Sequence, residues 1–370
     1  MSSNFASALR IAPSITKYLI VLLLLLNIRS WPLAWHFRVF RPVFKIRIRY
    51  KLMQWRNMFR SRIAQVQAED RWLDSITPIG ADPFNLTISY NSWASVDDSD
   101  FNGHLSNSSY AKTLDSARFK TALHMFPMFF RAGGWMALAA THYNFIREIP
   151  ILAQYEVRVS IGTWDQKWLY VVSKFVTKSS KKSMSKSNHK QITPPQSDSE
   201  ETTEPLFNAS VRTVSSPMPS TSQTPEEKLP ADTASALKAV TASLTSEPEP
   251  DGATLHTVSV SLCCFKVGRI TVPPALVMAT NGFCVPGVVG TYSPTNPPPN
   301  WQHAKSYMSK PSGGSTKKLQ ELYKGGWRNV PEGPERWWDV AMDGVVEEKR
   351  RARLDVMKGL GSGLTGARSL

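Results

Sequence analysis

A long polar stretch near the middle of the chain limits what the rest can fold into. Residues 178–252 are mainly Ser, Thr, Pro, Lys and Glu, with few large apolar side chains. Such a segment buries too little apolar surface to offset the entropy lost on ordering, so we predict a disordered insertion. A second stretch, 286–334, is rich in Pro and Gly and is predicted to be an extended linker. The foldable core is therefore 72–177 joined to 253–285, about one small domain.

The apolar pattern of this core predicts one strand, one helix and four further strands. Residues 85–93 alternate apolar and polar side chains, as a half-buried strand does. After an acidic turn, apolar residues recur every three or four positions, which indicates a helix capped by Ser106 or Asn107. The positions expected to be buried on this helix are Tyr110, Leu114, Ala117 (or Arg118), Thr121 and Met125. The β-rich segments that follow are 135–146, 153–161, 167–176 and 254–266. The insertion is then a long loop between neighbouring strands, which loop-closure entropy tolerates.

The N-terminal segment, residues 1–68, combines an apolar run with a series of basic residues. Tyr18–Leu26 is apolar throughout, and no Asp or Glu precedes Glu69. The run is shorter than the roughly 20 residues that a spanning helix needs. Adding Ile15 and Ile28 and letting the flanking cations snorkel allows a short span. We therefore predict an N-terminal membrane anchor with a basic flank.

The distribution of charge predicts how this anchor is oriented. Two cations precede the apolar run and ten follow it before Glu69. The positive-inside rule then places the following domain in the cytosol, which favours a single-pass protein of the endoplasmic reticulum. A mitochondrial presequence is the main alternative, because the opening stretch contains Arg and Ser and no acidic residue. The net charge of +15 is concentrated in this flank, so we expect no nucleic-acid partner.

The cysteines and the C-terminal segment give weaker expectations. Cys263, Cys264 and Cys284 are too few and too clustered for a disulfide framework, and no Cys/His pair has zinc-ligand spacing. We therefore expect buried free thiols, and neither a metal nor another cofactor. Residues 335–360 read as an amphipathic helix that docks on the core, a partner or a membrane. Its apolar positions are Trp338, Ala341, Val345, Ala352 and Val356.

The acidic turn before the predicted helix carries the most specific motif. Residues 98–110 read D-S-D-F-N-G-H-L-S-N-S-S-Y. This resembles the D-x-D-x-x-G-H-x-N-N-x-x-Y signature of the 4-hydroxybenzoyl-CoA thioesterase-like family, most closely a membrane-anchored, thioesterase-like branch with an N-terminal apolar segment. Residues 266–274 are similar to the closing strand of that family. The chain departs from the signature at Ser106, where the family has the first of two Asn residues.

The resemblance implies an α+β hotdog fold, in which a curved antiparallel sheet wraps a long helix. It also implies a homodimer with its active site near the subunit interface, and a fatty acyl-CoA as substrate. Asp100 matches the family's catalytic carboxylate, which acts as a general base on water or as a nucleophile. Backbone amides at the start of the helix, near Gly103 to Asn107, would form the oxyanion hole.

The other residues of the motif have two readings each. Asp98 is a second catalytic candidate or orients the turn, and His104 protonates the leaving thiolate or holds the loop. Gly103, Asn107 and Tyr110 are candidates for substrate binding, but a strained backbone, a helix cap and a core position would also account for them. At the level of the whole protein, a catalytically silent scaffold or an acyl-CoA-binding protein at a membrane is the alternative to a hydrolase.

Another hotdog chemistry, the hydration of enoyl thioesters, fits less well. Residues 100–104 faintly resemble the hydratase motif D-x-N-P-x-H, but the histidine comes one residue too early and the proline is missing. The sequence therefore favours thioester hydrolysis over hydration.

Overall fold

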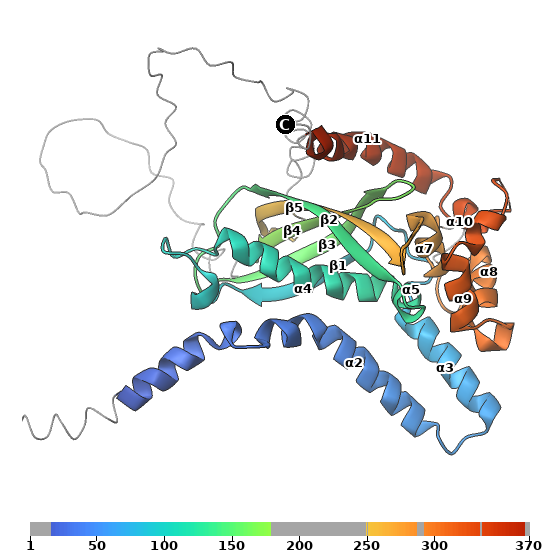
Figure 1. The fold of residues 1–370 in the computed structure, drawn as a ribbon, viewed down its shortest axis with the longest axis horizontal. Helices are drawn as coiled ribbons and strands as arrows, with labels where there is room; N and C mark the ends of the chain where they lie inside the picture. Colours follow the sequence, from blue (N-terminus) through green and yellow to red (C-terminus); the bar gives the residue numbers. More distant parts are fainter. Residues whose placement is uncertain (1–15, 179–248, 250, 287–291, 334, 367–370) are drawn as a thin grey trace, which may run out of the picture.

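The computed structural model describes residues 16–178, 249, 251–286, 292–333 and 335–366. The predicted disordered insertion lies almost entirely outside these ranges. Within them, one antiparallel sheet lies against a 19-residue helix, α4 (Figure 1). The strands are β1 (Thr87–Trp93), β2 (Trp135–Phe145), β3 (Gln154–Trp164), β4 (Leu169–Thr177), β5 (Thr254–Val267) and β6 (Ile270–Val272). The helices around them are η2 (Val96–Asp98), α4 (Asn107–Met125), α5 (Pro127–Arg131) and α7 (Pro274–Thr280).

The connectivity is that of a hotdog fold. The strand order across the sheet is β1-β3-β4-β5-β2, every pairing is antiparallel, and β6 adds to β5. Register shifts in the β2–β5, β3–β4 and β4–β5 pairings mark irregularities that bend the strands and help the sheet to curve around α4. The predicted order of one strand, one helix and four strands is confirmed, and each strand begins within two residues of its predicted start.

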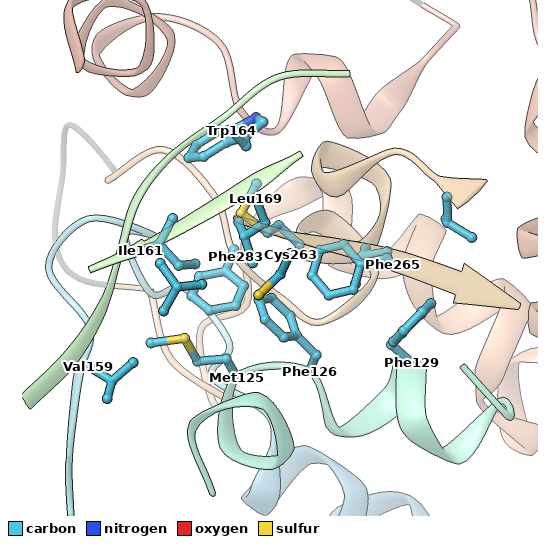
Figure 2. Packing of buried hydrophobic residues seen from close by; sticks show 14 of the residues in the cluster. Met125, Phe126, Phe129, Val159, Ile161, Trp164, Leu169, Cys263, Phe265 and Phe283 are labelled. Carbon is cyan, nitrogen blue, oxygen red and sulfur yellow. The ribbon is translucent and has the colours of Figure 1, made fainter. Parts of the chain in front are cut away.

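The core lies between α4 and the concave face of the sheet. The predicted inward positions of α4 are all buried: Tyr110, Leu114, Ala117, Thr121 and Met125. Beyond the end of α4, the rings of Phe126 and Phe129 both lie edge-on to Phe265 of β5, with centroids 4.9 and 5.1 Å away (Figure 2). A fully buried side chain of this size contributes about 1.5–3 kcal/mol, so this layer holds the helix to the sheet. The three cysteines are free and buried, as predicted.

The stretch predicted to be an extended linker, 286–334, contains helices where the structure describes it. They are α8 (Pro299–Met308), η3 (Lys310–Ser312), α9 (Thr316–Tyr323) and η4 (Gly326–Asn329). The linker prediction was therefore wrong for these residues. Pro299 occupies the first turn of α8, where proline favours a helix start, and Trp301 and Tyr323 are buried against other elements.

The predicted C-terminal helix is present, but it is interrupted. A short helix α10 (Trp337–Val340) and a long helix α11 (Val345–Gly366) are separated at Gly344, whose φ is +62°. This break changes the phase of the apolar pattern, so the predicted positions Val345, Ala352 and Val356 are exposed, whereas Trp338 and Ala341 are buried as expected. Within residues 345–359, the part of α11 whose side chains the structure describes, the buried residues are Val346, Leu354 and Met357. Leu354 and Met357 cluster with residues of β4 and β5 on the sheet face opposite α4, so α11 docks on the core (Figure 1).

Residues 16–76 form three α-helices and one short 3-10 helix beside the hotdog domain. Residues 16–26 are helical, and η1 (Ile28–Ser30), α2 (Ala34–Arg56) and α3 (Arg62–Ile76) follow. Helix α2 packs against α4, where Phe40 lies edge-on to Phe119 at 5.8 Å. Among the described residues, no helix combines the length and the apolar character needed to cross a membrane. The start of the expected span, before residue 16, lies outside the described residues.

Candidate active site

The acidic motif forms a short hairpin that leads directly into α4. The Ser106 N–H donates to the Asp98 carbonyl (3.0 Å), and the Asp100 N–H donates to the His104 carbonyl (2.8 Å). The Gly103 N–H closes the turn by donating to the Asp100 carbonyl at 3.1 Å. This antiparallel pairing sets Asp98 opposite the residue that precedes the helix, whereas Asp100 lies nearer the hairpin tip. The two acidic residues of the motif therefore have different surroundings.

Asp98 is a buried carboxylate held by three other side chains. Its Oδ1 accepts a hydrogen bond from Lys112 Nζ (2.8 Å), and its Oδ2 accepts one from Ser95 Oγ (2.8 Å) and lies 3.2 Å from Arg29 Nε. Burial raises the pKa of Asp98, but hydrogen bonds from Lys112 and Ser95 and the charge of Arg29 outweigh it, so the pKa lies below its ordinary value. Asp98 is 2% exposed. A carboxylate that is ionised and enclosed in this way suits a positioning role.

Arg29 connects this carboxylate to the end of β1. Its Nη1 donates to the Trp93 carbonyl (2.6 Å) and its Nη2 to Ser92 Oγ (3.1 Å), while the guanidinium lies 5.3 Å from the centroid of the Trp93 ring. Neither Arg29 nor Lys112 was predicted as a site residue. No local pattern identifies Arg29, because its partners lie far away in the sequence; Lys112 could have been found from its place in the second turn of the helix that follows the motif.

Asp100 has one engaged oxygen and one free oxygen. Its Oδ1 accepts hydrogen bonds from the N–H groups of Asn102 (3.0 Å) and His104 (3.3 Å). Within the part of the chain that the structure describes, its Oδ2 has no hydrogen bond or ion pair. The side chain is half-buried. The loop amides therefore fix the orientation of the carboxylate while leaving one oxygen available to attack a carbonyl or accept a proton.

The start of α4 offers backbone donors beside this hairpin. Ser106 occupies the N-cap position, but its Oγ donates to Ser109 Oγ (2.9 Å) and makes no capping hydrogen bond to a backbone amide. Asn107 is the first residue of the helix and its side chain is exposed, so the cap position is that of Ser106. Helix N-termini carry partial positive charge and unpaired N–H groups. These groups can stabilise negative charge on a bound carbonyl oxygen.

The remaining motif residues take different places. His104 Nδ1 lies 3.1 Å from Glu148 Oε2, and both side chains reach solvent. Gly103 adopts a left-handed φ of +76°, and a Cβ built there would meet no atom within 4 Å. Backbone conformation, not crowding, therefore accounts for this glycine. Tyr110 is 2% exposed and packs edge-on against Phe145 and Phe175, and burial raises its pKa. These contacts favour a packing role in the core for Tyr110 over contact with a substrate.

Two cavities are large enough to be considered as places where part of a substrate could bind. One, of about 670 Å³, is lined by residues of α10, α11 and the β3–β4 turn and by none of the predicted site residues. A smaller one, of about 240 Å³, lies between α4 and the edge strand β2. Its lining is mostly apolar, with Phe119, Phe130, Trp135 and Leu138 around the buried Arg118. This cavity, like the larger one, is lined by none of the predicted site residues.

Comparison with known proteins finds a family match over part of the chain. Residues 94–195 match the model of the Thioesterase-like superfamily. Thioesterase poxG of Penicillium oxalicum is 33% identical over 105 residues, covering 23% of this chain and 33% of that protein. Thioesterase lcsJ of Purpureocillium lilacinum is 27% identical over 193 residues, covering 43% of this chain and 58% of that protein. The matched regions thus span less than two thirds of the length of either relative.

Several solved structures align with about half of the chain. A 1,4-dihydroxy-2-naphthoyl-CoA thioesterase from Synechocystis aligns over 53% of this chain and 96% of its own, with 9% identity and a TM-score of 0.29. The superfamily match covers the motif hairpin, α4 and the strands β2 to β4. This match and the observed strand order both indicate a thioesterase-like hotdog domain in this part of the chain.

Proposed function

We propose that this protein hydrolyses acyl thioesters and that its substrates are acyl-CoA molecules. The observation that carries the proposal is the Asp100 carboxylate, with Oδ1 fixed by two loop amides and Oδ2 free, on a hairpin that runs into the N-terminus of α4. A carboxylate and a set of preorganised amide donors are the two elements that thioester hydrolysis requires. The named relatives support the same reaction class.

The proposed reaction uses Asp100 as a general base or as a nucleophile. As a base, Oδ2 takes a proton from water while the water oxygen bonds to the thioester carbonyl carbon. The carbonyl oxygen becomes negatively charged and is stabilised by amides at the start of α4. When the C–S bond breaks, the thiolate takes up the proton, which yields a carboxylic acid and a free thiol. As a nucleophile, Oδ2 bonds to the carbonyl carbon while the C–S bond breaks, which gives an acyl anhydride of Asp100 and a thiolate. Water then cleaves the anhydride: its hydroxide leaves with the acyl group as the carboxylic acid, its proton goes to the thiolate, and the Asp100 carboxylate is restored.

Asp98 acts as a positioning residue in this scheme. Its carbonyl accepts from the Ser106 N–H at the helix start, and its carboxylate accepts from Lys112 in the second turn of α4. It therefore holds the hairpin and the helix end in one arrangement. His104, which lies near Glu148 and Gly103, supports the hairpin tip. We assign Asn107 to the rim of the substrate site, because its side chain is exposed at the helix start.

We further propose that the protein is a homodimer joined through β2. Among the strands that the structure describes, it lies at the edge of the sheet and pairs with β5 alone. Trp135, Leu138 and Phe145 on it are each 46–48% exposed, and an edge strand with exposed apolar residues favours pairing with another strand. The 240 Å³ cavity borders the same strand, so a second copy would enclose it.

We also propose that the N-terminal segment holds the protein at a membrane, with the hotdog domain in the cytosol at the endoplasmic reticulum. Support comes from the exposed apolar helix at 16–26 and from the basic residues that follow it. A mitochondrial membrane is the alternative location. Imaging of a fluorescent fusion with and without residues 1–60 distinguishes the two.

The test of hydrolysis is the release of free thiol by the purified full chain from a panel of acyl-CoA molecules, from acetyl to stearoyl. We expect turnover that depends on chain length and that falls sharply in Asp100→Ala. Equal residual turnover in both proteins would favour the alternative, a silent acyl-CoA-binding scaffold. Binding of a non-hydrolysable acyl-CoA analogue, measured by calorimetry, then shows whether the scaffold still recognises the ligand.

A further inference from the structure

Helix α2 presents apolar residues on two opposite faces. On the inner face, Val39 is buried and the Tyr50 ring contacts Trp72 of α3 at 4.9 Å. The opposite face carries a row of exposed apolar side chains, called the outer row here: Phe37, Phe44, Ile48, Leu52 and Trp55. These residues recur at intervals of three, four or seven, which keeps them on one side of a helix. Each is 46–69% exposed, so the inner packing of α2 does not account for them.

Basic residues lie on both sides of the outer row. Helix α2 contains seven cations and no acidic residue: Arg38, Arg41, Lys45, Arg47, Arg49, Lys51 and Arg56. At about 100° per residue, Lys45 and Arg49 flank the row on one side and Arg47 and Lys51 on the other, while Arg41 falls within the row. Among the described residues, none of these seven cations forms an ion pair. Six of the seven, all except Arg38, are also exposed, so their charge is available to an external anionic partner.

The exposed apolar surface continues toward the N-terminus. Residues 18–26 are 41–73% exposed, and Trp31 and Leu33 between the two helices are 45% and 60% exposed. Figure 1 shows this helix and α2 on the same side of the molecule, beneath α4, while α11 covers the opposite side of the sheet. One side of the protein thus combines a long apolar strip with unpaired positive charge.

We propose that α2 lies in the plane of a membrane surface, with the outer row inserted between the lipids and its cations on anionic headgroups. An apolar row between two rows of cations is the pattern of an interfacial helix. The 23-residue helix is about 35 Å long, which spreads these contacts over many lipids. A second copy of this chain is a poorer occupant, because two faces with the same unpaired positive charge repel each other.

This inference rests on the proposed membrane location and is independent of hydrolysis. The test measures co-sedimentation of the full chain with phosphatidylcholine vesicles, with and without phosphatidylserine. The variant Phe44→Glu/Ile48→Glu is compared with Val340→Glu/Val345→Glu, which makes the same charge change at positions 56% and 52% exposed on the C-terminal helices. We expect the first variant to bind anionic vesicles at least about tenfold more weakly and the second to bind like wild type.

Three further double variants separate the sources of vesicle binding. Arg41→Gln/Lys45→Gln is expected to lose much of the preference for phosphatidylserine, whereas Lys317→Gln/Lys324→Gln retains it. Leu22→Glu/Leu23→Glu measures how much the helix at residues 16–26 contributes to vesicle binding. Wild-type binding by Phe44→Glu/Ile48→Glu, with all binding lost in Leu22→Glu/Leu23→Glu, would overturn the assignment to α2. So would a change of oligomeric state in the α2 variant without a change in vesicle binding.

Thiol release from a soluble short-chain acyl-CoA, measured without vesicles, keeps the two proposals apart. We expect Phe44→Glu/Ile48→Glu to hydrolyse this substrate at the wild-type rate. If wild type binds anionic vesicles but hydrolyses nothing, the proposed hydrolase fails and the membrane face stands. If wild type hydrolyses but binds no vesicle, the membrane face fails.

Discussion

The guanidinium of Arg29 lies 3.2 Å from the carboxylate of Asp98, although the first residue follows the N-terminal apolar helix and the second begins the motif hairpin. The Asp98 carboxylate also accepts a hydrogen bond from Lys112 of α4, and the Asp98 carbonyl accepts one from the Ser106 N–H. The N-terminal segment, the hairpin and the helix start are therefore joined through one buried carboxylate. The position of Asp100 depends on groups that are remote from it in the sequence.

Replacing Arg29 is expected to weaken this junction. Arg29→Ala removes a charged hydrogen-bonding partner of Asp98 and of the end of β1, which should cost about 1–3 kcal/mol in the free energy of unfolding. Urea denaturation measures that loss. Arg29→Lys keeps the charge but not the forked geometry, so we expect a smaller effect. Equal stability of wild type and Arg29→Ala would show that the contact with Asp98 contributes little.

The lowered pKa of Asp98 predicts a dependence of stability on pH. A carboxyl whose folded pKa lies below its ordinary value of 3.8 adds stability above that value, and this stability is lost as the pH falls from about 3.8 through the folded pKa. Asp98→Asn should therefore be less stable than wild type at pH 6, by about 2–4 kcal/mol, because Arg29 and Lys112 keep their charges. The difference should shrink below about pH 4. A difference that stays constant down to pH 3 would contradict the assignment.

The fold could be predicted from sequence because its signals are local. The alternation in β1 and the three- and four-residue spacing in α4 depend on neighbouring residues alone, and both elements appear where they were expected. The helices α8 and α9 were missed because the partners that bury Trp301 and Tyr323 lie far from them in the sequence. The ring centroid of Tyr323, for example, lies 5.2 Å from that of Phe129, and its hydroxyl is hydrogen-bonded to the Thr280 hydroxyl.

The candidate site could be predicted only in part. The motif located Asp98, Asp100 and Gly103 in one turn before a helix, which the structure bears out. It gave no sign that Asp98 is enclosed by Arg29 and Lys112 while one oxygen of Asp100 stays free. That difference arises from contacts across the fold, which a single sequence does not display.

Gly103 offers a test of the hairpin's geometry. Its φ of +76° is strained for any side chain with a Cβ, but space at the Cβ is open. Gly103→Ala should therefore cost about 1–2 kcal/mol through the backbone alone, and Gly103→Asn less, since Asn adopts left-handed φ more easily. Thermal unfolding ranks the two variants. The opposite ranking would mean that crowding, not φ, selects glycine here.

The exposed edge of β2 predicts the oligomeric state. Leu138→Glu places a charge at a residue 48% exposed on this strand and should convert a dimer to a monomer. Val356→Glu, at 39% exposed on α11, is the matched control and should leave the dimer intact. Light scattering coupled to size exclusion gives the mass directly. A wild-type monomer, or a Leu138→Glu dimer, would argue against this interface.

The most direct measurement is the turnover of acyl-CoA by Asp100→Asn beside wild type and Asp100→Ala. Asn keeps an oxygen that accepts from the Asn102 and His104 amides, so the hairpin should stay folded, while the group that attacks or takes the proton is lost. We predict that Asp100→Asn unfolds at nearly the wild-type temperature but turns over at least about 100-fold more slowly. Wild-type turnover by Asp100→Asn, with a defect only in Asp100→Ala, would show that the carboxylate shapes the loop and performs no chemistry.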